Sequence, residues 1–260
     1  MLHGIDPAFA ISGLAVGLLV GVTGVGGGSL MTPLLVLVFG VHPATAVGTD
    51  LLYAGLTKIS GGAVHAYHGS IDWRITRRLA YGSVPAALLS LLLLAHLGSS
   101  SKASGGIIST TLGIALLVTA VTLVFRKALL SRLTRLMDGA SESTVGVLTV
   151  VLGVVLGVLV TISSVGAGAI GATILLSLYP RSPIVRIVGS DIAHAVPLTL
   201  IAGAGHWWLG SVNLHMLVSL LAGSIPGIMI SSHFASRIPD RILRPILAGT
   251  LAVVGGRLAF

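Results

Sequence analysis

The string VGTDL at residues 47–51 recurs as VGSDI at residues 188–192, which is 141 positions later. At the same separation, GSVP at residues 82–85 recurs as GSIP at residues 223–226. Upstream, three glycines and a proline match at a separation of 140 positions: Gly17 with Gly157, Gly26 with Gly166, Gly28 with Gly168, and Pro43 with Pro183. A collinear series of this length is hard to obtain by chance, so we predict that the chain contains two duplicated units.

The composition around these strings is that of a membrane protein. Of the 260 residues, 54% are hydrophobic and only 8% are charged, and the mean hydropathy is +1.04. A typical soluble domain is about 25% charged. Apolar stretches such as 83–97 and 105–125 are long enough to cross, or nearly cross, a hydrocarbon layer of about 30 Å. The sequence therefore predicts an all-α polytopic membrane protein.

Charge, cysteine content and motifs exclude several classes of function. The net charge is +8, but the 15 basic residues lie almost entirely in predicted loops, which is typical of membrane proteins and removes the argument for nucleic-acid binding. Without cysteine, the chain has no disulfide and no thiolate metal site. Metalloprotease, P-loop and serine-hydrolase motifs are absent from the sequence, so we expect no enzyme activity, no cofactor and no metal.

The apolar segments follow the same order in both halves, two short segments and then three long ones. In the first repeat, residues 1–125, they are 8–22, 29–39, 45–67, 74–97 and 105–125. In the second repeat, residues 144–260, they are 144–161, 169–179, 184–208, 213–235 and 242–259. Residues 126–143 form a polar linker whose leucines and basic residues predict an amphipathic helix on the inner leaflet.

The basic residues discriminate between two paths for the short segments. If each short pair enters the membrane and returns, 12 basic residues lie on one side and 2 on the other; if each pair crosses once, the split is 8 against 6. The positive-inside rule favours the returning path, with both termini outside and residues 126–143 in the cytoplasm. The two units then have opposite orientation, and such inverted-topology repeats are common in secondary transporters.

Two turns rich in glycine and serine form the predicted substrate site. The first contains Gly24, Gly26, Gly27, Gly28 and Ser29, and the second contains Ser163, Ser164, Gly166 and Gly168. Each turn precedes a short helix, whose N-terminal N–H groups and positive dipole end suit an anion. Irregular backbone at membrane depth must be buried or line a polar cavity, so we expect the turns to meet near the midplane. The alternative is that the glycines only permit close helix packing.

Ionisable residues within spans are further candidates, because burying them unpaired costs several kcal/mol. Lys58 follows Asp50 by about two helical turns, so both can face one cavity. Lys58 is either an anion ligand or a counter-ion to Asp50 or Asp191. Each aspartate is either a helix N-cap or a site of proton or cation coupling. His194 is either a further coupling residue or a packed histidine.

The motif of the first half resembles that of a known family. GVGGGSL at residues 24–30, Pro33, and GV-x-P-x-x-AVGT at residues 40–49, together with the weaker second copy, are similar to the TauE/SafE sulfite exporter family, also called TSUP transporters. The resemblance covers nearly the whole chain. It implies transport of sulfur-containing anions such as sulfite or organosulfonates, and it adds Thr49 and Ser190 to the expected pathway.

Two hypotheses for the function follow. The first is a secondary transporter that exports a small sulfur oxyanion by alternating access with proton coupling. The second is an anion channel in which the glycine turns form a static filter. The expected partners are the small anionic substrate and the lipid bilayer of the cell membrane, and the sequence leaves a homo-oligomer open.

Overall fold

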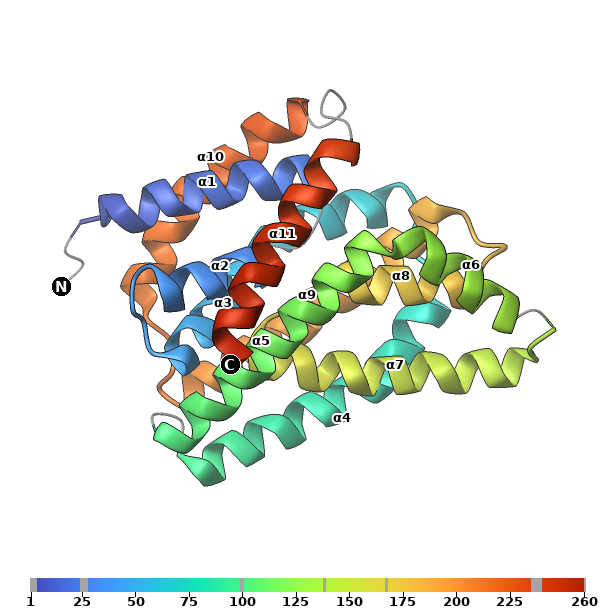
Figure 1. The fold of residues 1–260 in the computed structure, drawn as a ribbon, viewed down its shortest axis with the longest axis horizontal. Helices are drawn as coiled ribbons and strands as arrows, with labels where there is room; N and C mark the ends of the chain where they lie inside the picture. The colour runs from blue at the N-terminus through green and yellow to red at the C-terminus, as the bar shows by residue number, and fades with distance from the viewer. Residues whose placement is uncertain are drawn as a thin grey trace.

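The computed structural model describes residues 4–23, 28–98, 101–137, 139–166, 168–234 and 240–259. These residues form eleven α-helices (Figure 1). The first six are α1 (Pro7–Thr23), α2 (Gly28–Leu37), α3 (Pro43–Tyr67), α4 (Trp73–Leu97), α5 (Lys102–Val124) and α6 (Arg126–Leu136). The remaining five are α7 (Glu142–Ser163), α8 (Ala169–Leu178), α9 (Ile184–Trp208), α10 (Leu214–Phe234) and α11 (Asp240–Ala259). The prediction of an all-helical chain is confirmed.

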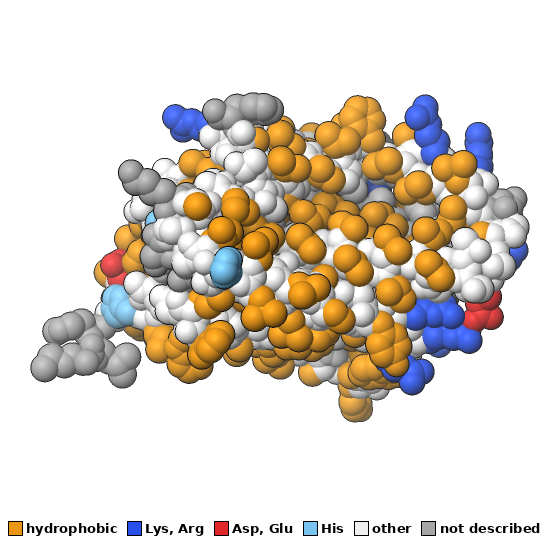
Figure 2. All heavy atoms as spheres, turned by 90° about the horizontal axis from the view of Figure 1, so that it is seen from below, with side chains coloured by type: hydrophobic (Ala, Val, Ile, Leu, Met, Phe, Trp, Pro, Cys, Tyr) orange, Lys and Arg blue, Asp and Glu red, His pale blue; other side chains and the backbone are white. Residues whose placement is uncertain are grey.

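Five of the described helices are long and apolar enough to cross a membrane: α4, α5, α7, α9 and α10. The outward side of α4 is aliphatic, with Leu88, Leu89, Leu92 and Leu93 exposed. Figure 2 shows hydrophobic side chains over the middle of the face, and most of the visible Lys and Arg side chains toward one end. This distribution is expected for a protein whose middle lies in lipid.

Helix α7 is longer than the predicted short segment 144–161. It begins at Glu142 because Ser141 caps it, with the Ser141 hydroxyl accepting a hydrogen bond from the Thr144 N–H at 3.1 Å. The resulting 22 residues are long enough for a full span. The apolar pattern alone missed this start, since the first turn of the helix is polar.

The helix pairs α1/α2 and α7/α8 both fold back on themselves. In the first pair, Phe9 of α1 lies against Phe39, which follows α2, with ring centroids 4.8 Å apart. In the second pair, the Thr149 hydroxyl of α7 lies 2.8 Å from the hydroxyl of Tyr179, which follows α8. Each pair is therefore a helical hairpin closed by a side-chain contact.

Basic residues gather where α4 and α7 begin and where α6 lies, which we call the basic end. Arg74 of α4 forms an ion pair with Glu142 of α7, and Arg78 lies 3.5 Å from the same carboxylate. Helix α6, which contains four basic residues, packs against α8. Figure 1 places α6 at the opposite end of the molecule from the N-terminus.

Glycines bring two helix pairs into backbone contact. A Cβ atom on Gly153 of α7 would collide with the Leu79 carbonyl oxygen of α4. A Cβ atom on Gly13 of α1 would collide with the Leu220 carbonyl oxygen of α10 in the same way. Small residues permit this close approach of membrane helices. Close helix packing, the alternative given above for the glycines of the two turns, is therefore the role of Gly13 and Gly153.

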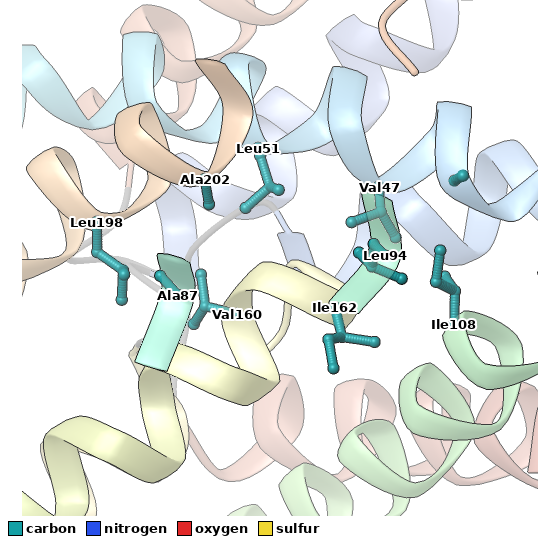
Figure 3. Close-up of a cluster of buried hydrophobic side chains, with 10 residues drawn as sticks. Val47, Leu51, Ala87, Leu94, Ile108, Val160, Ile162, Leu198 and Ala202 are labelled. Atoms are coloured by element: carbon teal, nitrogen blue, oxygen red, sulfur yellow. The ribbon is translucent and has the colours of Figure 1, made fainter. Parts of the chain in front are cut away.

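A buried apolar cluster lies between helices from both halves of the chain (Figure 3). Helices α3, α4 and α5 contribute Val47, Leu51, Ala87, Leu94 and Ile108. Helices α7 and α9 contribute Val160, Ile162, Leu198 and Ala202. Helices α3 and α9, which also pack directly against each other, therefore lie at the centre of the molecule.

Candidate functional site

Asp50 of α3 is fully buried, and α2 holds its carboxylate. The Thr32 hydroxyl donates a hydrogen bond to Oδ2 of Asp50. The Ser164 hydroxyl, at the C-terminus of α7, lies near the same carboxylate. Neither Oδ1 of Asp50 nor Oγ of Ser164 has a hydrogen-bond partner among the described residues. The turn between α7 and α8 therefore meets α2 and α3 at Asp50.

Asp191 of α9 lies against the first turn of α8. The Gly168 N–H lies near its carboxylate, and a Cβ atom on Gly171 would lie 2.8 Å from Oδ1 of Asp191. Gly166 and Gly168 have φ values of 127° and 114°, which L side chains rarely adopt. Glycine at these positions allows the N-terminus of α8 to approach the carboxylate.

The N-cap alternative for the two aspartates is wrong. Helix α3 begins at Pro43 and helix α9 begins at Ile184, so both aspartates lie about two turns inside their helices. A side chain at such a position cannot cap the free N–H groups of the first turn. Both carboxylates face the protein interior instead, with Asp50 0% and Asp191 4% exposed.

Lys58 extends from α3 toward both carboxylates. Its ammonium group interacts electrostatically with Asp50 and with Asp191. The ion pairs among the described residues involve Arg74 and Arg78, so Lys58 forms a close pair with neither aspartate in this part of the chain. Because the Lys58 ammonium group pairs closely with neither carboxylate, it can still donate charge-assisted hydrogen bonds to a bound anion.

His194 faces Lys58 from α9, one helical turn beyond Asp191. Its Nε2 atom lies 2.7 Å from the Ser83 hydroxyl of α4, and the ring interacts electrostatically with Lys58. Its Nδ1 atom is buried without a hydrogen-bond partner in the described part of the chain. One ring nitrogen thus remains for a ligand or a proton. We call Asp50, Lys58, Asp191, His194 and Ser164 the central cluster.

The sequence of this chain matches that of a known transporter family. Residues 9–258 match the family model described as "Sulfite exporter TauE/SafE". The chain belongs to the TauE/SafE sulfite exporter family. It is 38% identical over 252 residues to "Probable membrane transporter protein YjnA" of Bacillus subtilis (strain 168), covering 95% of this chain and 97% of the relative. It is 28% identical over 253 residues to "Probable membrane transporter protein YdhB" of the same organism, covering 94% and 96%.

Membership of the TauE/SafE family makes this protein a multi-pass membrane transporter and not an enzyme. The resemblance seen in the motif around residues 24–49 is confirmed. No solved structure gives a significant match to the chain. The assignment of individual residues in this TauE/SafE transporter therefore depends on its own geometry.

Two predicted pathway residues of the TauE/SafE transporter have their hydroxyls engaged outside the central cluster. The Thr49 hydroxyl accepts a hydrogen bond from the Asn213 N–H at 3.1 Å. The Ser190 hydroxyl accepts one from the Asp72 N–H at 2.8 Å and donates one to the Arg186 carbonyl at 2.7 Å. These contacts fix the connections that precede α10 and α4. A role for Thr49 and Ser190 in substrate binding stays a prediction.

The remaining predicted residues belong to the two turns. Gly24, Gly26 and Gly27 lie outside the described residues. Gly28 is the first residue of α2, and Ser29 is buried in its first turn. The Ser163 hydroxyl is engaged locally, since it donates to the Leu159 carbonyl at 2.6 Å and accepts from the Val165 N–H at 3.3 Å. Of the second turn, Ser164 thus belongs to the central cluster and Gly168 lies beside its Asp191.

The sequence reasoning missed three polar residues at this site. Thr32, which holds Asp50, stands within the first motif but was not distinguished from its neighbours. Ser83, which holds His194, lies in the repeated GSVP string, so the repeat itself contained a signal. Tyr53, one turn beyond Asp50 on α3, interacts electrostatically with it and had no sequence signal.

The hydrogen bond between Thr32 and Asp50 can be tested by substitution. Thr32→Val is expected to lower the midpoint of thermal unfolding in detergent, because a hydrogen bond to a charged group contributes about 1.5–3 kcal/mol. In an Asp50→Asn background the same substitution should cost less than about 1 kcal/mol, as measured by a double-mutant cycle. Thr119→Val, which removes a hydroxyl bonded within α5, is the control. Equal losses in both backgrounds would show that Thr32 and Asp50 are not coupled.

Proposed function

We propose that this TauE/SafE transporter is a secondary carrier that exports a small sulfur oxyanion, such as sulfite or an organosulfonate, by alternating access with coupled protons. The central cluster is the observation that supports this proposal. It combines the ammonium group of Lys58 with the N-terminus of α8, and both attract anions. The sulfur oxyanion as substrate is suggested by the family description.

The carrier proposal includes two inverted repeats, residues 1–125 and 144–260, joined by the linker 126–143. Reciprocal contacts support it. Asn213 donates to Thr49, and the residues 141 positions away make the mirror contact, in which Asp72 donates to Ser190. A contact and its mirror, each joining one half to the other, are what a two-fold axis produces. Such repeats can exchange conformations and so expose a central site to either side.

The proposed orientation places the basic end in the cytoplasm and both termini outside. Support comes from Arg74 and Arg78 near the start of α4, which pair with Glu142, and from Arg135 of α6, which lines a cavity together with Arg181 at the same end. Cytoplasmic loops of membrane proteins are enriched in such residues. In this orientation the hairpins α1/α2 and α7/α8 open to opposite sides of the membrane.

Charge balance supports coupling between the anion and a proton. When Asp50, Asp191 and Lys58 are all ionised, they carry a net charge of −1, and a bound monoanion adds another negative charge. Uncompensated charge is costly in a water-excluded interior. A proton that binds with the anion restores the charge of the empty site. We therefore expect the anion and the proton to move in the same direction.

Efflux of labelled sulfite from proteoliposomes tests the proposal. The expected result is saturable efflux that is accelerated by an acidic lumen and by unlabelled sulfite outside. Protein-free liposomes provide the control, because they report the passive leak of sulfur dioxide. Unitary currents without such counterflow would support the anion channel with a static filter. Lack of saturable flux for every sulfur oxyanion tested would contradict the proposal.

A further inference from the structure

Four buried polar atoms of the central cluster lack a hydrogen-bond partner among the described residues. They are Oδ1 of Asp50, Oγ of Ser164, Oδ1 of Asp191 and Nδ1 of His194. They come from α3, from the turn between α7 and α8, and from α9. Buried polar side-chain atoms are normally hydrogen-bonded, so these four indicate which groups a ligand has to supply.

The unpartnered atoms call for a donor as well as for acceptors. An ionised carboxylate only accepts hydrogen bonds, so Oδ1 of Asp50 and Oδ1 of Asp191 require two donors, of which the Ser164 hydroxyl beside Asp50 can supply one. The Lys58 ammonium group only donates, and the first N–H groups of α8 donate as well. A ligand that completes the cluster must therefore accept through anionic oxygens and also donate through an O–H group.

The charges that face the site lead to the same requirement. In the described part of the chain, the titratable groups that interact with Lys58 are Asp50 of α3 and Asp191 and His194 of α9, and Tyr53 of α3 interacts with Asp50. Helix α2 and the turn after α7 contribute the neutral side chains of Thr32 and Ser164. A doubly charged oxyanion would meet two carboxylates and one ammonium group. An oxyanion that keeps one proton has half that charge and offers a donor to a carboxylate.

We infer that the central cluster binds an oxyanion in its singly protonated form, as a monoanion with one O–H group, in preference to a dianion or to a monoanion without O–H. This inference rests on the proposed function, since it names the form of the anion that the carrier takes. For sulfite, that form is the O–H tautomer of hydrogen sulfite. Lys58 and the α8 N-terminus donate to its charged oxygens, and its O–H donates to Asp50 or Asp191.

Methylphosphonate and methanesulfonate test the requirement for an O–H group. Below the second dissociation of methylphosphonate both are monoanions of nearly the same shape, and they differ by one O–H. A hydrogen bond to a charged group contributes about 1.5–3 kcal/mol. Methylphosphonate should therefore inhibit sulfite efflux at a concentration at least about 10-fold lower than methanesulfonate does. At a pH above its second dissociation, methylphosphonate is a dianion without an O–H group, and its advantage over methanesulfonate should be lost. Methanesulfonate does not change charge, so it reports any titration of the protein itself.

The thermal unfolding of the detergent-solubilised protein supplies a readout that does not depend on transport. Methylphosphonate should raise the unfolding midpoint more than methanesulfonate does. Asp50→Asn and Asp191→Asn identify the acceptor, because an amide can donate to a sulfonate oxygen and the variant that loses the acceptor should lose the preference. Equal stabilisation of the native protein by both anions, or a preference for the dianion, overturns the inference. Absence of sulfite flux with the binding preference retained overturns the proposed function alone.

Discussion

Replacing Lys58 with methionine is expected to reduce sulfite efflux about 100-fold while the protein still folds. The substitution removes the only described ammonium group near Asp50 and Asp191, so the anion would face two carboxylates alone. A hydrogen bond from the ammonium group to the anion contributes about 1.5–3 kcal/mol, and about 3 kcal/mol corresponds to 100-fold. Initial rates from proteoliposomes measure the loss. Size-exclusion elution and the unfolding midpoint report folding.

Two variants serve as controls for Lys58→Met. Lys127→Met makes the same chemical change on the exposed surface of α6, and it should leave efflux within about 2-fold of the native rate, as surface charges contribute little. Lys58→Arg keeps the charge and should retain more activity than Lys58→Met. Unchanged kinetics in Lys58→Met would remove Lys58 from the substrate pathway.

Gly153→Val is expected to have the largest effect on stability. Helix α7 lies so close to α4 at this position that a Cβ atom would collide with the Leu79 carbonyl oxygen, and backbone cannot move aside as a side chain can. Overpacking of a well-packed core costs about 1–3 kcal/mol, and a collision with backbone belongs at the upper end of this range. The unfolding midpoint in detergent should fall by roughly 10 °C.

Gly106→Val on α5 is the matched control for Gly153→Val. A Cβ atom at Gly106 would meet nothing within 4 Å, and the valine side chain replaces glycine in a helix, where glycine is itself unfavourable. Its unfolding midpoint should equal or exceed that of the native protein. Similar midpoints for the two variants would show that α4 and α7 do not pack through Gly153.

The sequence was sufficient to predict the helical architecture and several members of the central cluster. Lys58 and Asp50 could be found because an ionisable residue in an apolar segment is rare and costly. The second turn could be found because its glycines recur at a fixed separation from those of the first. Gly166 and Gly168 do have the positive φ values that such a turn requires.

The contacts within the site could not be predicted in the same way. Helix α2 has ten residues and is apolar nearly all round, so its sequence does not show which face would bring Thr32 to Asp50. The contact between Ser83 and His194 depends on how α4 crosses α9, which residue periodicity does not specify. The N-cap interpretation of Asp50 failed because α3 begins at Pro43, which places Asp50 about two turns inside the helix.

We propose that the turn after α7 lies at an anion site that opens alternately to both sides of the membrane. The chain has no cysteine, so Ser164→Cys supplies a single thiol at that turn, and Ser131→Cys on the exposed surface of α6 is the control. In sealed vesicles, a membrane-impermeant thiol reagent should label Ser164→Cys from either side, and methylphosphonate, at a pH below its second dissociation, should slow the labelling. Ser131→Cys should react from one side only, with or without methylphosphonate. Labelling of Ser164→Cys from one side under all conditions, or at a rate that methylphosphonate does not change, while transport persists, would contradict alternating access at this turn.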